Sequence, residues 1–287
     1  MGPMEVRLAD KRGFCFGVTG AIERAEQAVA ENPPGTVHSL GPVIHNRQVV
    51  ERLTASGLDQ SADLDAVPAG HTVLIRSHGV GPDVIKRAEQ RGLKVVDASC
   101  VLVKRAQKIV RELHEQGYQV VMIGDRDHPE VRGVIGYAPD VIVVGDDTDL
   151  DAALPRLGRL GIVAQTTHSP QHVAKVIGQI AERPFREMKV VNTLCMEVVR
   201  RQEAAVALAR EVDVMFVLGG LHSANTQQLA RLCHEAGCPT YHLESWSQFE
   251  GSMASGRRVA GVTAGASTPE EVIQEFVARL RAFEVAD

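Results

Sequence analysis

A short phrase that ends in cysteine occurs twice in this chain, and the repeat constrains the fold more than any other feature. The run Lys-Val-Val-Asp-Ala-Ser-Cys at 94–100 is echoed by Lys-Val-Val-Asn-Thr-Leu-Cys at 189–195. A third cysteine follows another strand-like run after a short loop, so that Cys15, Cys100 and Cys195 stand at nearly equal intervals. Internal self-similarity of this kind indicates repeated structural units. We therefore expect three similar units, each of which aims one thiol at a shared centre.

Each third of the chain reads as the same order of elements. After each cysteine comes an amphipathic stretch in which apolar residues recur at helical spacing, at 18–30, 103–116 and 198–210. Short apolar runs, which are typical of strands buried on both faces, follow at 36–40, 120–124 and 214–219. Each third then closes with a strand that runs into a polar tip, at 73–79, 162–167 and 259–267. This alternation predicts an α/β protein made of three similar α/β units.

These patterns divide the 287-residue chain into units at 14–98, 99–193 and 194–287. Residues 1–13 are assigned to the last unit, because their apolar run precedes Cys15 as residues 95–96 precede Cys100. A proline follows the closing strand of each unit, and proline is favourable at the first position of a helix because its missing N–H would be unpaired there. We therefore expect helices to begin at Pro82, Pro170 and Pro269.

Polar residues gather in the loops directly after the strands. Ligands of open α/β sheets bind at the carboxyl ends of the strands, so three units with pseudo-three-fold symmetry can point these loops and all three cysteines into one cavity. The imidazole, hydroxyl and amide groups in the loops are donors suited to an anion: His45, His78, His128, Ser223, Asn225 and Ser267. Glu130 is the one carboxylate at a loop tip, where it could be a solvated residue or a general acid.

Composition excludes several classes of protein. A net charge of −5, one Trp and three Tyr leave no electrostatic or stacking footprint for nucleic acid. No apolar run approaches the ~20 residues of a membrane span, and residues 1–5 lack the apolar core of a signal peptide. No phosphate-binding loop or dinucleotide fingerprint indicates ATP or NAD. We expect a soluble, cytoplasmic protein whose five cysteines are thiols rather than disulfides.

Three equivalent thiols indicate a metal centre. A single cysteine is most often a small buried hydrophobe, but the repeat gives three of them the same place in three units. A [4Fe–4S] cluster held by three thiolates has one iron without a protein ligand, and that iron can act as a Lewis acid. Zinc held by three cysteines and one of the eleven histidines is the competitor, although the close cysteine spacing of compact zinc sites is absent. Cys233 and Cys238 lie outside the repeat and are assigned to packing.

Short motifs, in order over essentially the whole chain, carry a further signal. They lie at 12–18, 43–47, 77–80, 97–100, 128–133, 165–167, 201–204 and 261–267, and include Arg-Gly-Phe-Cys-Phe-Gly-Val, His-Pro-Glu-Val-Arg-Gly and Gly-Val-Thr-Ala-Gly-Ala-Ser. In these motifs the chain resembles the 4-hydroxy-3-methylbut-2-enyl diphosphate reductase family. That family supplies the last enzyme of the methylerythritol phosphate route to isoprenoids.

The resemblance implies a three-lobed α/β trefoil around a central [4Fe–4S] cluster, with Cys15, Cys100 and Cys195 as its ligands. It implies reductive dehydroxylation of 4-hydroxy-3-methylbut-2-enyl diphosphate to isopentenyl and dimethylallyl diphosphate, with electrons from ferredoxin or flavodoxin. In this family pattern Glu130 relays protons and Thr166 hydrogen-bonds near the substrate hydroxyl. The diphosphate is held by His45, His78, Ser223, Asn225 and Ser267, with His128 close by as both a substrate-binding and a catalytic residue.

The chain departs from the family pattern at a few positions. Ala224 stands where the family usually has a serine, and a hydrogen bond from that hydroxyl to a charged group is worth about 1.5–3 kcal/mol. Glu197 and Val198 stand where the family has a small residue and a hydroxyl, and Val101 replaces a usual proline. A carboxylate at Glu197 is unfavourable near an anionic ligand unless it is paired. These changes bear on substrate identity and affinity more than on the class of reaction.

Two other functions fit the same residues. One is a paralogue that carries out the same cluster-based dehydroxylation on another allylic substrate. The other is an iron–sulfur sensor that uses the cluster without turnover. Turnover of the diphosphate, compared with turnover of its non-phosphorylated alcohol, distinguishes the paralogue from the diphosphate reductase. Glu130→Gln distinguishes the sensor, because only the enzyme needs a proton relay and would lose turnover.

Overall fold

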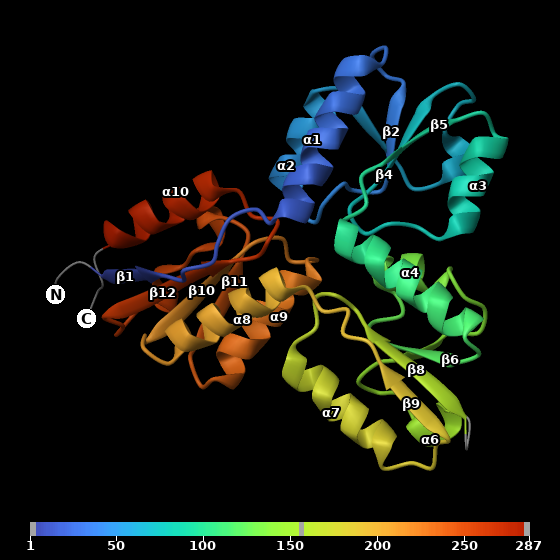
Figure 1. Ribbon diagram of the computed structural model, residues 1–287. Helices are drawn as coiled ribbons and strands as arrows, with labels where there is room; N and C mark the ends of the chain where they lie inside the picture. The colour runs from blue at the N-terminus through green and yellow to red at the C-terminus, as the bar shows by residue number, and fades with distance from the viewer. Residues whose placement is uncertain (1–3, 155–157, 284–287) are drawn as a thin grey trace. The chain divides into compact units, whose positions relative to one another are not determined.

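The computed structural model describes residues 4–154 and 158–283, which contain three four-stranded parallel sheets (Figure 1). The first sheet has the order β1 (Glu5–Leu8), β12 (Val259–Ala264), β10 (Val214–Leu218) and β11 (Thr240–Leu243). The second has the order β3 (Leu58–Ser61), β2 (Val37–Leu40), β4 (Thr72–Ile75) and β5 (Lys94–Asp97). The third has the order β7 (Ile142–Val144), β6 (Gln119–Ile123), β8 (Arg159–Ala164) and β9 (Glu187–Val190).

The three sheets share one topology. In each, the strand that precedes a cysteine (β1, β5 or β9) lies at an edge and pairs with the closing strand of the repeat (β12, β4 or β8). The closing strand pairs in turn with β10, β2 or β6. The predicted α/β architecture of three similar units is confirmed. The proposed domain boundaries at 14–98, 99–193 and 194–287 with 1–13 stay a prediction.

Helices follow the strands in the predicted order. After the cysteines come α1 (Phe16–Glu31), α4 (Val101–Glu115) and α8 (Met196–Ala209), and after the first strand of each repeat come α2 (Arg47–Ala55), α5 (Pro129–Ile135) and α9 (Ala224–Glu235). After the closing strands come α3 (Pro82–Gln90), α7 (Pro170–Ala181) and α10 (Glu270–Arg281), while α6 (Leu150–Ala153) is a single turn. Short 3₁₀ turns lie at Leu64–Ala66, Trp246–Gln248 and Gly251–Met253.

Two of the three helices that were predicted to begin at a proline do so, and the third begins one residue later. Pro82 and Pro170 are the first residues of α3 and α7, as predicted. Pro269 instead precedes α10, because its ψ of 146° is extended and the helix begins at Glu270. The two acidic residues of that first turn then lie at the positive end of the helix, where they are favourable.

The described chain divides into two compact units. The one-sheet unit takes in the residues up to Val18, His45–Val49 and the residues from Met196 onward, and the two-sheet unit takes in Thr19–Ile44 and Val50–Cys195. In the one-sheet unit, α10 covers one face of the sheet and α8 with α9 the other (Figure 1). Its core centres on Phe216 and Phe276, whose ring centroids lie 5.4 Å apart and whose side chains are fully buried.

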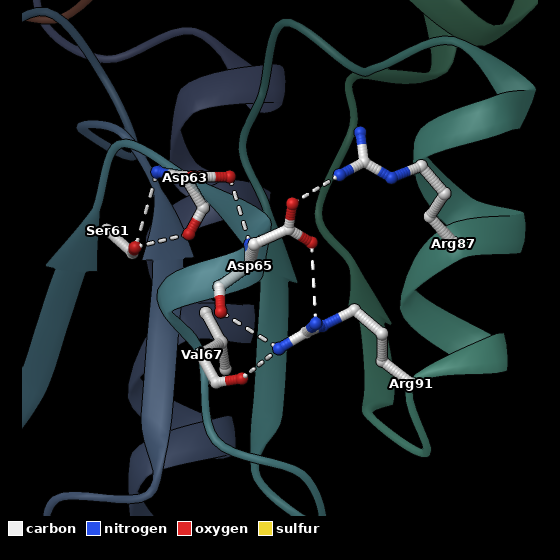
Figure 2. Close-up of polar contacts among 6 residues, drawn as sticks. All are labelled: Ser61, Asp63, Asp65, Val67, Arg87 and Arg91. Carbon is white, nitrogen blue, oxygen red and sulfur yellow. Dashed lines mark hydrogen bonds and ion pairs between the residues drawn. The ribbon is translucent and has the colours of Figure 1, made fainter.

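Polar contacts in the two-sheet unit fasten α3 to the 3₁₀ turn that follows β3 (Figure 2). Arg87 donates to Asp65 Oδ2 at 2.8 Å, and Arg91 donates to the carbonyls of Asp65 and Val67 at 2.9 and 3.1 Å. The Arg87–Asp65 pair is about half exposed, so it contributes little to the free energy of unfolding. Its role is to fix where α3 lies after the loop that carries His78.

No helix among the described residues is both long and apolar enough to span a bilayer.

Candidate functional site

The three repeated cysteines are held in the same way. The N–H of each donates to the carbonyl of the residue two positions beyond the end of a closing strand. These pairs are Cys15 with Ala266 at 3.2 Å, Cys100 with Ser77 at 2.9 Å, and Cys195 with Thr166 at 2.9 Å. Each cysteine is also the residue directly before a helix, namely α1, α4 or α8. The backbone thus gives each of the three thiols an equivalent place beside a strand tip.

These positions suit thiolate ligands of a metal centre. None of the five cysteines is in a disulfide; Cys15 and Cys100 are partly exposed, and Cys195 is buried. The positive end of a helix dipole stabilises negative charge, so a cysteine placed before a helix is suited to bind as a thiolate. The donor set of three such thiols fits an iron–sulfur cluster. By contrast, burial raises the pKa of Cys233 to about 12, and its Sγ lies in the apolar layer around α9 with that of Cys238.

Glu130 and Thr166 form a closed pair in the two-sheet unit. Glu130 is in the first turn of α5 and is only 2% exposed, which excludes a solvated loop residue. Its Oε1 accepts the N–H of Thr166 at 2.7 Å, and its Oε2 accepts the Thr166 hydroxyl at 2.8 Å. Burial raises the pKa of Glu130, although the two hydrogen bonds from Thr166 oppose that rise. The structure therefore places a carboxyl group that can hold a proton at the tip of β8.

The same side chains connect to a cysteine through the backbone. Thr166 donates twice to Glu130, and its own carbonyl accepts the N–H of Cys195. His128 precedes α5 and caps it, since its Nδ1 accepts the N–H of Glu130 at 3.2 Å. Three predicted site residues, Glu130, Thr166 and Cys195, are thus linked in one short network with His128 at its edge.

His78 reaches this network because two backbone segments pack without side chains between them. A Cβ atom at Gly133 in α5 would lie 3.0 Å from the carbonyl oxygen of Gly79, and one at Gly136 would lie 3.0 Å from the Cα of Gly81. The loop after β4 therefore touches α5, and the rings of His78 and His128 meet edge to face with centroids 5.5 Å apart. Sequence analysis missed the packing role of these glycines; the available signal was two glycines three residues apart, directly after His-Pro-Glu-Val-Arg.

The one-sheet unit gathers a second set of predicted residues. Ser223 precedes α9 and its Oγ accepts the N–H of Thr226 at 3.4 Å. Both polar atoms of the Asn225 side-chain amide are buried without a hydrogen-bond partner among the residues that the structure describes. Ser267 donates to the carbonyl of His45 at 3.3 Å. An amide left unpaired in this way costs about 1–3 kcal/mol, and both of its polar atoms are available to a ligand.

The loop that carries His45 lies directly against the tip of β10. A Cβ atom at Gly220 would fall 2.3 Å from the His45 carbonyl oxygen, so only glycine permits this approach. Asn46 in turn accepts the N–H of Val49 at 3.1 Å and starts α2. The close approach explains why a histidine far from Ser267 in the sequence shares a hydrogen bond with it.

A buried arginine explains the unexpected Glu197. Arg201 is 1% exposed and donates to the carbonyls of Ala264 and Gly13 at 3.0 and 3.1 Å. Glu197, one turn earlier in α8, lies 3.8 Å from its Nη2. The carboxylate at 197 is therefore paired with a buried cation. Arg201 joins the loop before Cys15 to the end of β12, a role that sequence analysis did not assign.

Comparisons with known proteins extend these observations. A family model described as LytB protein matches residues 6–281. The chain is 43% identical to 4-hydroxy-3-methylbut-2-enyl diphosphate reductase of Geobacter sulfurreducens over 98% of each protein. It is 37% identical to the protein of that name from Caldanaerobacter subterraneus over 99% of each.

Two solved structures are also similar. One, described as (E)-4-hydroxy-3-methyl-but-2-enyl diphosphate reductase, the terminal enzyme of the non-mevalonate pathway, is 39% identical with a TM-score of 0.69, over 98% of this chain and 100% of that one. The other is E-1-hydroxy-2-methyl-but-2-enyl-4-diphosphate reductase from Plasmodium falciparum. It is 26% identical with a TM-score of 0.90, over 96% of this chain and 88% of that one.

Proposed function

The chain belongs to the LytB protein family, and on that premise we propose that it reduces 4-hydroxy-3-methylbut-2-enyl diphosphate to isopentenyl and dimethylallyl diphosphate. It is an oxidoreductase of isoprenoid biosynthesis. The allylic C–O bond breaks, a C–H bond forms, and the oxygen leaves as water. Two electrons and two protons balance the reaction, so the site needs an electron source and a group that supplies protons.

The observation that carries this proposal is the network of Glu130, Thr166 and Cys195. It supports a proton donor held next to a thiol that can ligate a cluster. Glu130 is buried, and burial raises the pKa of its carboxyl group, which favours the protonated form that a general acid needs. Burial of a carboxyl group costs free energy of desolvation. A sensor that used a cluster without turnover would gain nothing from that burial.

Cys15, Cys100 and Cys195 would hold the iron–sulfur cluster. With three thiolates on a [4Fe–4S] cluster, one iron lacks a protein ligand, and the bound group supplies electrons and a Lewis-acid position for the substrate oxygen. Electrons would come one at a time from ferredoxin or flavodoxin. Thr166 would orient the substrate hydroxyl through its own hydroxyl group, which Glu130 holds in place.

The diphosphate would be bound by amide, hydroxyl and imidazole donors. In the one-sheet unit, Asn225 offers an unpaired buried amide at the start of α9, beside Ser223. The N–H groups at a helix start add to these side chains because they are unpaired in the helix itself. Ser267, His45, His78 and His128 would complete the set. Glu197 does not repel the anion, since Arg201 lies beside it.

The proposal is tested by anaerobic reconstitution followed by two assays. The protein should turn brown and take up ~4 iron per chain, in keeping with one cubane cluster. With reduced methyl viologen it should convert the diphosphate and leave the corresponding non-phosphorylated alcohol almost untouched. Equal turnover of the alcohol would indicate a paralogue with another substrate. A reconstituted protein that binds iron but reduces neither compound would indicate a sensor.

A further inference from the structure

We propose that the exposed face of α4 beside Cys100 is the docking surface for a small acidic electron-carrier protein. This face, called the α4 face below, consists of Val101, Arg105 and Lys108 in the two-sheet unit. The inference rests on the proposed function, because that reaction consumes electrons that must arrive from outside the chain. It goes further by naming where the carrier binds and which charge it has.

The first observation is an apolar side chain left in solvent directly after each repeated cysteine. Six large apolar residues are exposed within the described part of the chain, and three of them are Phe16, Val101 and Met196, at 54%, 63% and 52%. Single exposed apolar residues are common on soluble proteins and need no explanation. Here, however, the exposed residue has the same position in all three repeats. Each repeat therefore has an apolar surface one residue after a candidate cluster ligand.

The second observation is that the chain places basic side chains in line with Val101. Residues at i, i+4 and i+7 share one face of a helix, and both Arg105 and Lys108 are exposed there. Arg105 Nη1 also donates to the Asn192 carbonyl at 3.1 Å, and Lys108 Nζ lies 3.5 Å from Glu112 Oε1. Exposed contacts of this kind are weak, so a partner protein can compete for both cations. Lys104 borders this face, with its Nζ 2.7 Å from Asp97 Oδ2. The first turn of α4 has no acidic residue, so the positive end of the helix dipole reinforces the side-chain charges.

The third observation is that this basic character is local. The whole chain has a net charge of −5, whereas α4 carries four basic residues and two acidic ones, with both acidic residues in its second half. The other two helices that follow a repeated cysteine differ. Phe16 is followed by uncharged residues up to Glu23, and Met196 is followed at once by Glu197. Charge complementarity therefore selects α4 as the place for an acidic partner.

The location suits electron entry. Cys100 is partly exposed and directly precedes Val101. A carrier bound to the α4 face would therefore contact the residue next to a proposed ligand thiol. A basic rim around an apolar contact steers an acidic protein and raises its association rate by about 10–10³-fold at low salt. The apolar centre then provides the short-range contact that a transient electron-transfer complex requires.

The test compares two reductants on matched charge-reversal variants of the reconstituted protein. The variant Arg105→Glu with Lys108→Glu reverses the α4 face, and the control Lys86→Glu with Lys175→Glu reverses two exposed lysines on α3 and α7 of the same unit. One assay uses a reduced bacterial ferredoxin as the carrier. The other uses reduced methyl viologen, a small cation that needs no docking surface.

We expect the α4 variant to lose about tenfold in kcat/KM for ferredoxin at low salt and to keep its viologen-driven rate within about twofold. The wild-type ferredoxin rate should fall as salt is raised, and the variant should show a flatter dependence. The control should match the wild type in both assays. An unchanged ferredoxin rate in the α4 variant, or an equal loss with viologen, overturns the proposal.

A binding measurement keeps this inference separate from the proposed function. Fluorescence anisotropy of labelled ferredoxin reports docking without turnover, and the α4 variant should bind about tenfold more weakly than the control. Absence of viologen-driven turnover in the wild type contradicts the proposed function alone. Sedimentation that reveals a wild-type dimer, which the α4 variant dissociates, shows that a second copy occupies this face and overturns the carrier assignment.

Discussion

Two buried polar groups in this protein have opposite surroundings. In the two-sheet unit, both oxygens of Glu130 accept hydrogen bonds from Thr166, so the carboxyl group is satisfied by the protein itself. In the one-sheet unit, both polar atoms of the Asn225 amide are buried and lack a partner among the described residues. A satisfied buried group is held rigidly, whereas an unsatisfied one costs stability until a ligand arrives.

The difference separates two tasks in the proposed reaction. A proton donor must be in place before the substrate arrives, so the protein supplies the partners of Glu130. A binding group is useful when its hydrogen bonds are made only with the ligand, so the protein leaves Asn225 open. Substitution of Glu130 should therefore affect turnover, and substitution of Asn225 should affect substrate binding. The largest effect is expected at Glu130.

Glu130→Gln keeps the shape of the side chain and can still accept the N–H of Thr166, but it removes the acidic proton and its NH2 group must donate to the Thr166 hydroxyl instead of accepting from it. We expect kcat to fall by about 10²–10⁴-fold, because general acid catalysis contributes that range. Iron content should be unchanged, since Glu130 is linked to Cys195 through Thr166 and is not itself a proposed cluster ligand. Glu89→Gln, on the exposed surface of α3, is the control. A variant with wild-type turnover would remove Glu130 from the mechanism.

Asn225→Ala should weaken substrate binding without weakening the fold. We expect KM to rise by about 10–100-fold, the equivalent of one hydrogen bond to a charged group. The thermal midpoint of the ligand-free protein should stay level or increase, because no protein partner is lost.

The contrasting variant is Thr193→Val in the two-sheet unit. The Thr193 hydroxyl is buried and accepts the N–H of Ala164 at 2.8 Å, so its loss should lower the free energy of unfolding by about 1–3 kcal/mol. Chemical denaturation of both variants measures this difference. If Asn225→Ala were the more destabilising of the two, Asn225 would be a structural residue instead of a ligand group.

Ala224→Ser restores a hydroxyl at the start of α9, between Ser223 and Asn225. One added hydrogen bond to a diphosphate oxygen should lower KM by about tenfold, with kcat little changed. Steady-state kinetics with the diphosphate measures both constants. An unchanged KM would indicate that the backbone N–H groups of this helix start already satisfy the anion.

The smallest expected effect is a pH dependence of stability. Burial raises the pKa of Glu130 in the folded state, so the folded protein binds more protons than the unfolded chain between the two pKa values. Stability from this group is therefore complete below the unfolded pKa and is lost as pH rises through the folded pKa. Glutamine does not titrate. The thermal midpoint of Glu130→Gln relative to the wild type should therefore increase as pH rises above the ordinary pKa of a glutamate carboxyl group, which is about 4.3. A difference that stays constant with pH would show that Glu130 does not change its charge there.

Local patterns determined much of the fold in advance. The three apolar strands and the amphipathic helix of each repeat follow from periodicity, which depends on neighbours in the chain alone. The equivalent places of Cys15, Cys100 and Cys195 follow from the repeat, and the motifs around them identified the family. Pro269 lies one residue outside its predicted place, because the fixed φ of proline suits both the first helical position and the residue before it.

The contacts between distant segments were beyond the reach of the sequence. No pattern reports that Arg201 neutralises Glu197 while it holds the carbonyl of Gly13, since those partners depend on how α8 packs against β12. The approach of Gly133 to Gly79 likewise depends on the packing of α5 on a loop from another repeat.

The sequence by itself determined the three-fold repeat, the thiols and the kinds of group available for chemistry, because each is a matter of residue type and spacing. Only the tertiary structure decided which of those groups are buried and which are paired. Glu130 and Asn225 are both polar residues near a helix start, and nothing local distinguishes a carboxyl group bonded to Thr166 from an amide left unpaired. Burial and pairing arise when strand tips far apart in the chain meet, and free energies of desolvation are set by that environment.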